Sequence, residues 1–397
     1  MQAALAFNRR IWALFRLGAP PLLLLRVVRW IVRFVAREFA FQFSAILGGT
    51  LVASLTLGTA EGALGKAWRA ALAFFLTIEL RFAWLSWRTT RVIERELQDE
   101  IPGDPPESRF PKSHLWFPLL MLLARSVKVE RGVVFHSEEH RRVRLDIYRS
   151  RKGLADGERL PAVIQVHGGG WILGSRSEQG IPLLNHLAAN GWIGFNVDYR
   201  LSPRATLPEH VIDVKRAIAW VRENADDLGV DPTRICITGG SAGGHLTALT
   251  ALTANDRSLQ PGFEDADTSV LAAVPFYGIY DLADRQHFYP QFHDWLFEKV
   301  VLKQSLADAE DMYRSVSPVH RVTEDAPAFL VFHGDEDTLV PVEDARAFVK
   351  RLEDVSQNAV LYVEMPGAEH AFDIFPSLRT ARVVECIERF LREEAKT

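Results

Sequence analysis

The segment Ile235-Cys236-Ile237-Thr238-Gly239-Gly240-Ser241-Ala242-Gly243-Gly244 decides the fold. Its β-branched apolar start predicts a buried strand, and the residues after the serine predict a helix. Between them stands G-x-S-x-G, the sharp strand-to-helix turn that exposes a serine hydroxyl. Side chains at Gly239 and Gly243 would collide with neighbouring backbone there, and the helix directs its positive end at the serine. Ser241 is therefore a candidate nucleophile; the alternative is a glycine-rich turn without chemistry.

The pattern on both sides of this turn alternates strands and helices. Strands are predicted at 127–135, 142–148, 161–167, 192–197, 235–238, 270–276, 328–332 and 360–363, and helices at 208–228, 242–254, 342–355 and 377–394. This spacing is typical of an α/β fold, with a mainly parallel sheet covered by helices on both faces. Ligands of such sheets bind beyond the carboxyl ends of the strands, so we expect the chemistry there.

A reactive serine needs a base, and the base needs an acid that orients it. In this architecture the chain order is Ser, acid, His, and His370 is the histidine that follows both Ser241 and a strand-end acid. The strand at 328–332 runs into His333-Gly334-Asp335-Glu336-Asp337. We choose Asp337 as the acid and keep Asp335 as the alternative, because aspartates in such loops also serve as turn or cap residues.

The segment His167-Gly168-Gly169-Gly170-Trp171 leaves the strand predicted at 161–167. Consecutive glycines let backbone N–H groups approach a substrate closely. Such a loop upstream of the serine turn is the expected second half of an oxyanion hole. The alternative is a merely flexible loop.

Five motifs stand in order along the chain: HGGGW (167–171), DYRLSP (198–203), GGSAGGHL (239–246), HGDEDTLVP (333–341) and GAEHAF (367–372). Over about residues 125–395 the set resembles the hormone-sensitive-lipase-like α/β-hydrolases. Within them it is most similar to actinobacterial membrane- or cell-wall-associated carboxylesterases. The resemblance implies the α/β-hydrolase fold and a triad of Ser241, Asp337 and His370.

The same resemblance implies oxyanion donors at Gly169, Gly170 and Ala242, with Gly168 in the same loop. His167 then shapes the loop and takes no part in the chemistry. The chain departs from the family at Gly240, where an acid often precedes the nucleophile.

The activity that this resemblance implies is that of a serine carboxylesterase or lipase, which hydrolyses small-molecule or lipid-like acyl esters through an acyl-enzyme. An aryl-amide, formamide or feruloyl-type hydrolase with the same triad is the alternative, and a non-catalytic ligand receptor is a third reading. Residues 281–320 are rich in aromatic side chains and are expected to form a cap over the acyl pocket, unless they are an ordinary surface helix. The acyl and alcohol preferences and the oligomeric state, including a homo-oligomer, stay open.

No cofactor or metal is expected. His136-Ser137-Glu138-Glu139-His140 matches the H-x-x-E-H zinc pattern, but it joins two predicted strands and lacks the required helix. The sequence has no phosphate-binding or dinucleotide motif. Two cysteines exclude a disulfide framework, and a net charge of −4 gives no case for nucleic-acid binding.

The charge is unevenly distributed, because residues 1–125 hold 16 Lys+Arg against 9 Asp+Glu while the rest is acidic. Residues 1–97 are expected to be a helical segment that is membrane-associated or acts as a cap. Residues 98–112, with four prolines and four acids, are expected to be a linker, and 113–397 the catalytic domain. Since every proposed site residue lies after residue 165, removal of 1–97 is expected to spare the chemical step.

Arginines 26, 29, 33 and 37 share one face of a predicted helix that could lie on anionic lipid, or could pack on the protein with a solvated edge. Residues 40–60 carry no charge and could span a bilayer, and Gly48-Gly49 permits close helix packing or a break. Residues 70–87 contain Glu79 and Arg81 and favour a partner or interfacial helix. The expected location is the bacterial cell membrane or envelope, with a cytoplasmic N-terminus and the side of the catalytic domain left open.

Overall fold

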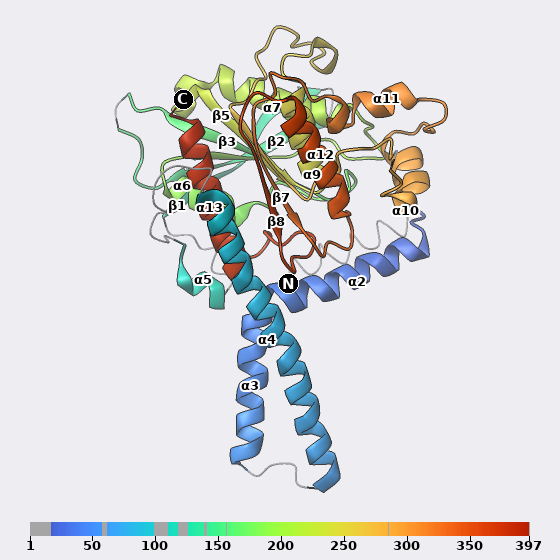
Figure 1. Ribbon diagram of the computed structural model, residues 1–397. Helices are drawn as coiled ribbons and strands as arrows, with labels where there is room; N and C mark the ends of the chain where they lie inside the picture. The colour runs from blue at the N-terminus through green and yellow to red at the C-terminus, as the bar shows by residue number, and fades with distance from the viewer. Residues whose placement is uncertain are drawn as a thin grey trace.

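The computed structural model describes residues 17–57, 62–98, 110–117, 126–138, 141–155, 157–284 and 286–396. Its strands form one eight-stranded sheet in the order β1-β2-β4-β3-β5-β6-β7-β8 (Figure 1). The strands are β1 Val127–Glu138, β2 Arg141–Ser150, β3 Leu160–Val166, β4 Ile193–Val197, β5 Val230–Gly240, β6 Ala272–Phe276, β7 Ala328–Gly334 and β8 Val360–Met365. Strand β2 is antiparallel to β1 and β4, and all the other neighbours are parallel.

Helices cover both faces of this sheet. They are α6 Ile181–Ala189, α7 Glu209–Glu223, α8 Ala225–Leu228, α9 Ala242–Leu252, α12 Val342–Val355 and α13 Leu378–Glu394, with a short 3₁₀ turn, η2, at Arg257–Leu259. One hydrophobic core joins the sheet to α7, α9 and α12, and a second core joins it to α6 and α13. The mainly parallel, two-faced architecture predicted from the sequence is therefore confirmed.

The predicted cap region, 281–320, consists of short helical pieces beside the C-terminal edge of the sheet. They are α10 Pro290–Phe292, the π-helix η3 His293–Val301, α11 Glu310–Ser315 and η4 Pro318–His320. Its aromatic residues Tyr289, Trp295 and Phe297 are each at most 7% exposed and belong to the main core. These aromatic side chains are therefore part of the packed core, and a role of the region as a cap stays a prediction.

Within the described residues, four helices precede the sheet: α2 Pro21–Glu38, α3 Ala40–Thr56, α4 Gly62–Gln98 and α5 Lys112–Trp116. Figure 1 shows α2 lying across the base of the α/β domain, while α3 and the first half of α4 project away from it side by side. Gly48 allows close packing here, because a Cβ at this position would lie 4.0 Å from Cδ1 of Leu76. The helix continues through Gly48-Gly49, so packing, not a break, explains these glycines.

Of the uncharged stretch at 40–60, which could span a bilayer, the structure describes residues 40–57. Helix α3 has 17 residues, or roughly 26 Å, which is shorter than the hydrocarbon core of a bilayer. Helix α4 is long and apolar enough to cross a membrane over Gly62–Arg95, whereas α2 and α3 qualify only as a pair bent by 71°. Residues 70–87 therefore belong to the longer candidate. Residues 99–109 of the predicted linker lie outside the described chain.

The arginine face of α2 also differs from the expectation. Arg33 and Arg37 turn toward the α/β domain and pair with its acids, so an assignment of both to lipid head groups is wrong. Arg26 and Arg29 are exposed. Because α2 and the second half of α4 pack on the α/β domain, removal of residues 1–97 would uncover that domain's core.

Candidate active site

The turn at Ser241 has the strained backbone that the sequence pattern predicts. Ser241 has φ of 59° and ψ of −123°, between the end of β5 and the first residue of α9. A Cβ at Gly239 would lie 2.5 Å from the carbonyl oxygen of Val166, and one at Gly243 would lie 2.2 Å from the same oxygen. The predicted collisions with neighbouring backbone are therefore confirmed. Such local strain is held in place where a side chain must be presented at a site.

His370 and Asp337 meet on the loops that follow β8 and β7. Nδ1 of His370 lies 2.6 Å from Oδ2 of Asp337, whose side chain is fully buried. The other oxygen, Oδ1, accepts the N–H groups of Leu339 and Val340, both at 2.8 Å. Burial opposes ionisation, but the charge of His370 and hydrogen bonds from His333 and His370 hold the pKa of Asp337 below its usual range.

Asp335 has a different place. Its Oδ1 accepts the N–H of Gly367 at 2.7 Å, which braces the turn before His370. Of the two candidate acids, only Asp337 contacts the histidine within the described residues. Asp335 therefore fits the alternative role of a turn residue, because its carboxylate accepts a backbone N–H group.

Tyr277 links the histidine to the serine turn. Its ring centroid is 4.5 Å from that of His370, and its hydroxyl donates to Asp373. A Cβ at Gly240 would lie 2.6 Å from the Tyr277 hydroxyl and 2.8 Å from the ring. A side chain at position 240, directly before Ser241, would therefore collide with Tyr277. In the described chain no hydrogen bond joins Ser241 to His370, a contact that is often long until substrate binds.

The HGGGW loop lies against the serine turn. A Cβ at Gly168 would stand 3.1 Å from Cβ of Ser241. The N–H of Gly168 donates to Oε1 of Gln179 at 2.6 Å, so this group is not available as an oxyanion donor. Within the described residues the N–H groups of Gly169, Gly170 and Ala242 have no acceptor.

Buried aromatic and histidine side chains pack against the HGGGW loop and hold it in place. His167 stacks on Tyr199, with ring centroids 4.4 Å apart, and the Tyr199 hydroxyl donates to the His167 carbonyl oxygen. Trp171 donates from Nε1 to Nδ1 of His245 at 3.3 Å, and Nε2 of His245 lies 2.7 Å from the carbonyl oxygen of Val316. Burial lowers the pKa of His245 to about 4, so this ring is neutral and structural.

A cleft of about 420 Å³ opens beside this loop. It is lined by His167, Gly174, Ser175, Asp198, Tyr199 and Leu201, together with Val143 and four arginines, at positions 141, 142, 200 and 204. Arg200 is occupied by Asp213 and Glu209, which accept from its guanidinium at 2.8 Å. The proposed triad residues do not line this cleft, so it is separate from the serine turn.

Several residues that contact the proposed site residues were not predicted from the sequence. Gln179 accepts the N–H of Gly168 in the HGGGW loop, Tyr277 packs on His370, and Glu369 accepts from Thr338 beside Asp337. Only Glu369 lies within a quoted motif, GAEHAF, and an acid directly before the histidine is the signal that could have drawn attention to it.

The BD-FAE family model matches residues 145–352, more than half of the chain. The chain belongs to the BD-FAE family. The BD-FAE region includes the serine turn, the HGGGW loop and Asp337, whereas His370 lies after its end.

Mycobacterial proteins resemble the chain over the BD-FAE region and beyond. It is 46% identical over 276 residues to the probable carboxylic ester hydrolase LipM of Mycobacterium tuberculosis, covering 70% of this chain and 64% of LipM. It is 47% identical over 247 residues to the esterase LipQ of the same organism, covering 62% and 58%. The matches thus span about three fifths of these relatives' own length. The predicted resemblance to actinobacterial carboxylesterases is confirmed.

Solved structures confirm the α/β-hydrolase fold of the BD-FAE domain. The butyrate-bound esterase Est2 of Thermogutta terrifontis superposes with a TM-score of 0.58 at 29% identity, covering 68% of this chain and 95% of Est2. The same esterase phosphonylated by sarin gives a TM-score of 0.59 at 27% identity, covering 74% and 98%.

Proposed function

We propose that this chain is a serine carboxylic ester hydrolase that works at a membrane surface. The observation that carries the proposal is the 2.6 Å pairing of His370 with a buried, ionised Asp337, at the sheet edge where the strained Ser241 turn also lies. The esterase names of LipM, LipQ and Est2 support the same class of activity.

Acylation begins at the serine hydroxyl. Because Nδ1 of His370 faces Asp337, Nε2 is the nitrogen that takes the proton from Ser241 as its oxygen attacks the ester carbonyl. The Asp337 carboxylate stabilises the imidazolium that results. The developing oxyanion receives the N–H groups of Gly169, Gly170 and Ala242, and the N-terminus of α9 favours its negative charge.

Breakdown of the tetrahedral intermediate follows in the usual sense of general acid catalysis. The imidazolium returns its proton to the alcohol oxygen as that bond breaks, which leaves an acyl ester on Ser241. Water, deprotonated by His370, then attacks the acyl-enzyme and releases the carboxylic acid. Gly168 takes no part as a donor in this scheme, because its N–H is held by Gln179.

We infer that the acyl chain lies between the oxyanion loop and the cap at 281–320. A Cβ at Gly170 would lie 4.0 Å from Leu296 of the π-helix, which brings an apolar cap residue to the loop. Phe297 packs edge-on to Trp171 of the same loop. This apolar surrounding favours acyl esters, and butyrate in Est2 suggests short acyl chains as the first substrates to test.

We also infer that the α3–α4 hairpin enters a lipid bilayer. Its large apolar side chains are exposed, among them Ile46, Val52, Leu55, Leu64, Trp68, Phe74 and Phe75. Trp84 and Trp87, about half exposed, lie nearer the α/β domain, as the aromatic belt of an interfacial region requires. An apolar surface of this size on a helix pair is otherwise costly in water.

Helix α2 then lies in the plane of the interface, since it is bent by 71° from α3. Its exposed residues Leu22, Leu25 and Val32, each at least 64% exposed, form an apolar surface, and the exposed Arg26 is available for head groups. Because the hairpin returns, α2 and the hydrolase lie on one side of the bilayer. The arginine-rich α2 makes this the cytoplasmic side.

A substrate panel tests the activity. Full-length protein in detergent is offered p-nitrophenyl esters of increasing acyl length and p-nitroanilides of the same acids. The proposal expects ester turnover that exceeds amide turnover at every chain length and is lost in Ser241→Ala. Amide turnover above ester turnover would favour the aryl-amide alternative, and hydrolysis unchanged in Ser241→Ala would reject the serine mechanism.

A further inference from the structure

Helix α2 contacts both loops that carry the proposed acid and base. Nε1 of Trp30 donates to the backbone carbonyl oxygen of His370 at 2.9 Å. Nε of Arg33 donates to Glu369 at 2.7 Å, and its Nη2 donates to Glu336 at 2.9 Å. Glu369 directly precedes His370, and Glu336 directly precedes Asp337. One guanidinium therefore bridges the residues next to the two members of the pair.

Glu369 is the centre of this arrangement. Its side chain is fully buried, and Oε1 accepts the N–H and hydroxyl of Thr338 at 2.7 and 2.9 Å and the N–H of His370 at 3.2 Å. Thr338 follows Asp337, so this carboxylate ties the acid loop to the base loop. Its other oxygen, Oε2, accepts from Nε of Arg33, which is the cation that pairs with Glu369 within the described residues.

A buried carboxylate needs a counter-charge and a partner for each oxygen. Loss of the Arg33 guanidinium would leave Glu369 charged and half-satisfied in a site closed to water. Glu369 can escape this cost by turning toward solvent. This change alters the bonds to Thr338 and His370, and with them the separation of Asp337 from His370.

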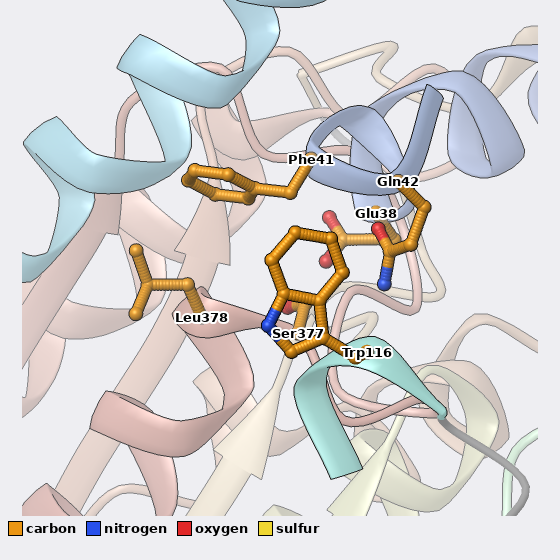
Figure 2. A pocket seen from close by; sticks show the side chains of 6 residues that line it. All are labelled: Glu38, Phe41, Gln42, Trp116, Ser377 and Leu378. Atoms are coloured by element: carbon orange, nitrogen blue, oxygen red, sulfur yellow. The ribbon is translucent and has the colours of Figure 1, made fainter. Parts of the chain in front are cut away.

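The helix that supplies this arginine is fixed at both ends. At its start the Leu17 carbonyl oxygen accepts from Nε1 of Trp295 in the cap at 3.0 Å. At its end the buried Glu38 pairs with Arg379 at the start of α13. Glu38 and Ser377 line a small cavity of about 120 Å³. Figure 2 shows them together with Phe41 and Trp116, which line the same cavity. Arg33 is thus held in place by an anchored helix.

We propose that Arg33 is a positioning residue of the triad, which holds the Asp337 and His370 loops in register through Glu369 and Glu336. Arg33 touches neither triad side chain, so it acts through the two glutamates. The inference rests on the proposed function, since it takes His370 and Asp337 as base and acid. It makes α2 part of the catalytic arrangement as well as of the membrane surface.

The test compares Arg33→Gln with Arg29→Gln in the full-length protein, with p-nitrophenyl butyrate as substrate. Both variants lose one positive charge from α2, but Arg29 is exposed and has no bonded partner in the described chain. We expect kcat of Arg33→Gln to fall about 10- to 100-fold with KM within about threefold of wild type, because misplacement of the base costs turnover and not binding. Arg29→Gln should match the wild type.

Arg33→Lys tests whether a positive charge at position 33 is sufficient without the planar guanidinium. A lysine can pair with Glu369 but cannot bridge both glutamates as the planar guanidinium does, so kcat should lie between those of wild type and Arg33→Gln. If Arg33→Gln fails to fold, a reduced kcat with unchanged KM in Arg33→Lys carries the test. Wild-type kcat in either folded variant, or an equal loss in Arg29→Gln, overturns the proposal. A wild type without esterase activity would instead reject the proposed function.

Discussion

Asp337 and His370 are joined by a contact of 2.6 Å between Oδ2 and Nδ1, although they come from loops after two different strands. Strands β7 and β8 are parallel neighbours, so their carboxyl ends bring the two loops together. The sequence HGDED offers two aspartates, and the geometry separates their roles.

Substitution of each aspartate tests that separation. Asp337→Asn should lower kcat by about 10³-fold or more, because the amide no longer fixes the histidine tautomer or stabilises the imidazolium. Asp335→Asn should retain activity within about tenfold, since it loses only a brace to Gly367. Initial rates on a short ester, with melting temperatures to verify folding, give the comparison. A dead Asp335→Asn beside an active Asp337→Asn would contradict the assignment.

The space taken by Tyr277 gives a second prediction. In Gly240→Ala the new Cβ would meet the Tyr277 ring at 2.8 Å, and overpacking of this kind costs about 1–3 kcal/mol. We expect a lower melting temperature and a lower kcat, because the ring is displaced toward His370. The double variant Gly240→Ala/Tyr277→Ala should lose less stability than the two single variants together. If the stability losses of the two single variants simply add up in the double variant, the side chains at positions 240 and 277 are not in contact.

A pH prediction comes from Asp344 at the start of α12. It accepts the Tyr280 N–H and the Tyr289 hydroxyl, and burial raises its pKa to about 7. A raised pKa means that the folded protein binds this proton more tightly than the unfolded chain. The stability from this group is complete near pH 4 and is lost as pH rises through 7.

The side chain at position 344 is neutral at every pH in Asp344→Asn. The melting temperature of this variant, relative to that of the wild type, should therefore rise between pH 5 and pH 8. The expected relative gain is roughly 5 °C. Thermal unfolding of both proteins in matched buffers measures it. A difference that stays constant over this range would show that Asp344 does not titrate there.

The hairpin gives a prediction about membrane binding. Gly48 and Leu76 lie side by side, so residues 49–75 can be replaced by a short Gly/Ser loop without loss of α2. The shortened protein should leave the membrane fraction and still hydrolyse a water-soluble ester within about threefold of wild type. High salt should not release the full-length protein, because apolar burial is not screened. Continued sedimentation of the shortened protein with membranes would place the attachment elsewhere.

Local patterns made most of the α/β domain predictable. The G-x-S-x-G turn, the apolar strands and the chain order of the site residues each follow from short-range rules, and the strand positions agree with the structure within a few residues, except that β5 begins earlier. Helix α6 was not predicted, and the helix expected at 208–228 is divided at Asn224 into α7 and α8.

Contacts between distant segments could not be predicted in this way. Arg33 and Arg37 have the spacing of basic residues on an amphipathic membrane-surface helix. Their partners, however, lie about 300 residues later in the chain. Nothing in the local sequence of α2 indicates Glu336 or Glu369. The same holds for Gln179, which removes Gly168 from the oxyanion donors through a side-chain contact.

The central claim is that Ser241 is the nucleophile, and reaction with an organophosphonate tests it most directly. The full-length protein is treated with a fluorophosphonate, and the adduct is located by peptide mass spectrometry while residual ester hydrolysis is measured in parallel. We expect one adduct on Ser241, a loss of hydrolysis in proportion to labelling, and no labelling of Ser241→Ala. Full labelling at Ser241 with hydrolysis intact, or an adduct on another residue that accounts for the loss, would contradict it.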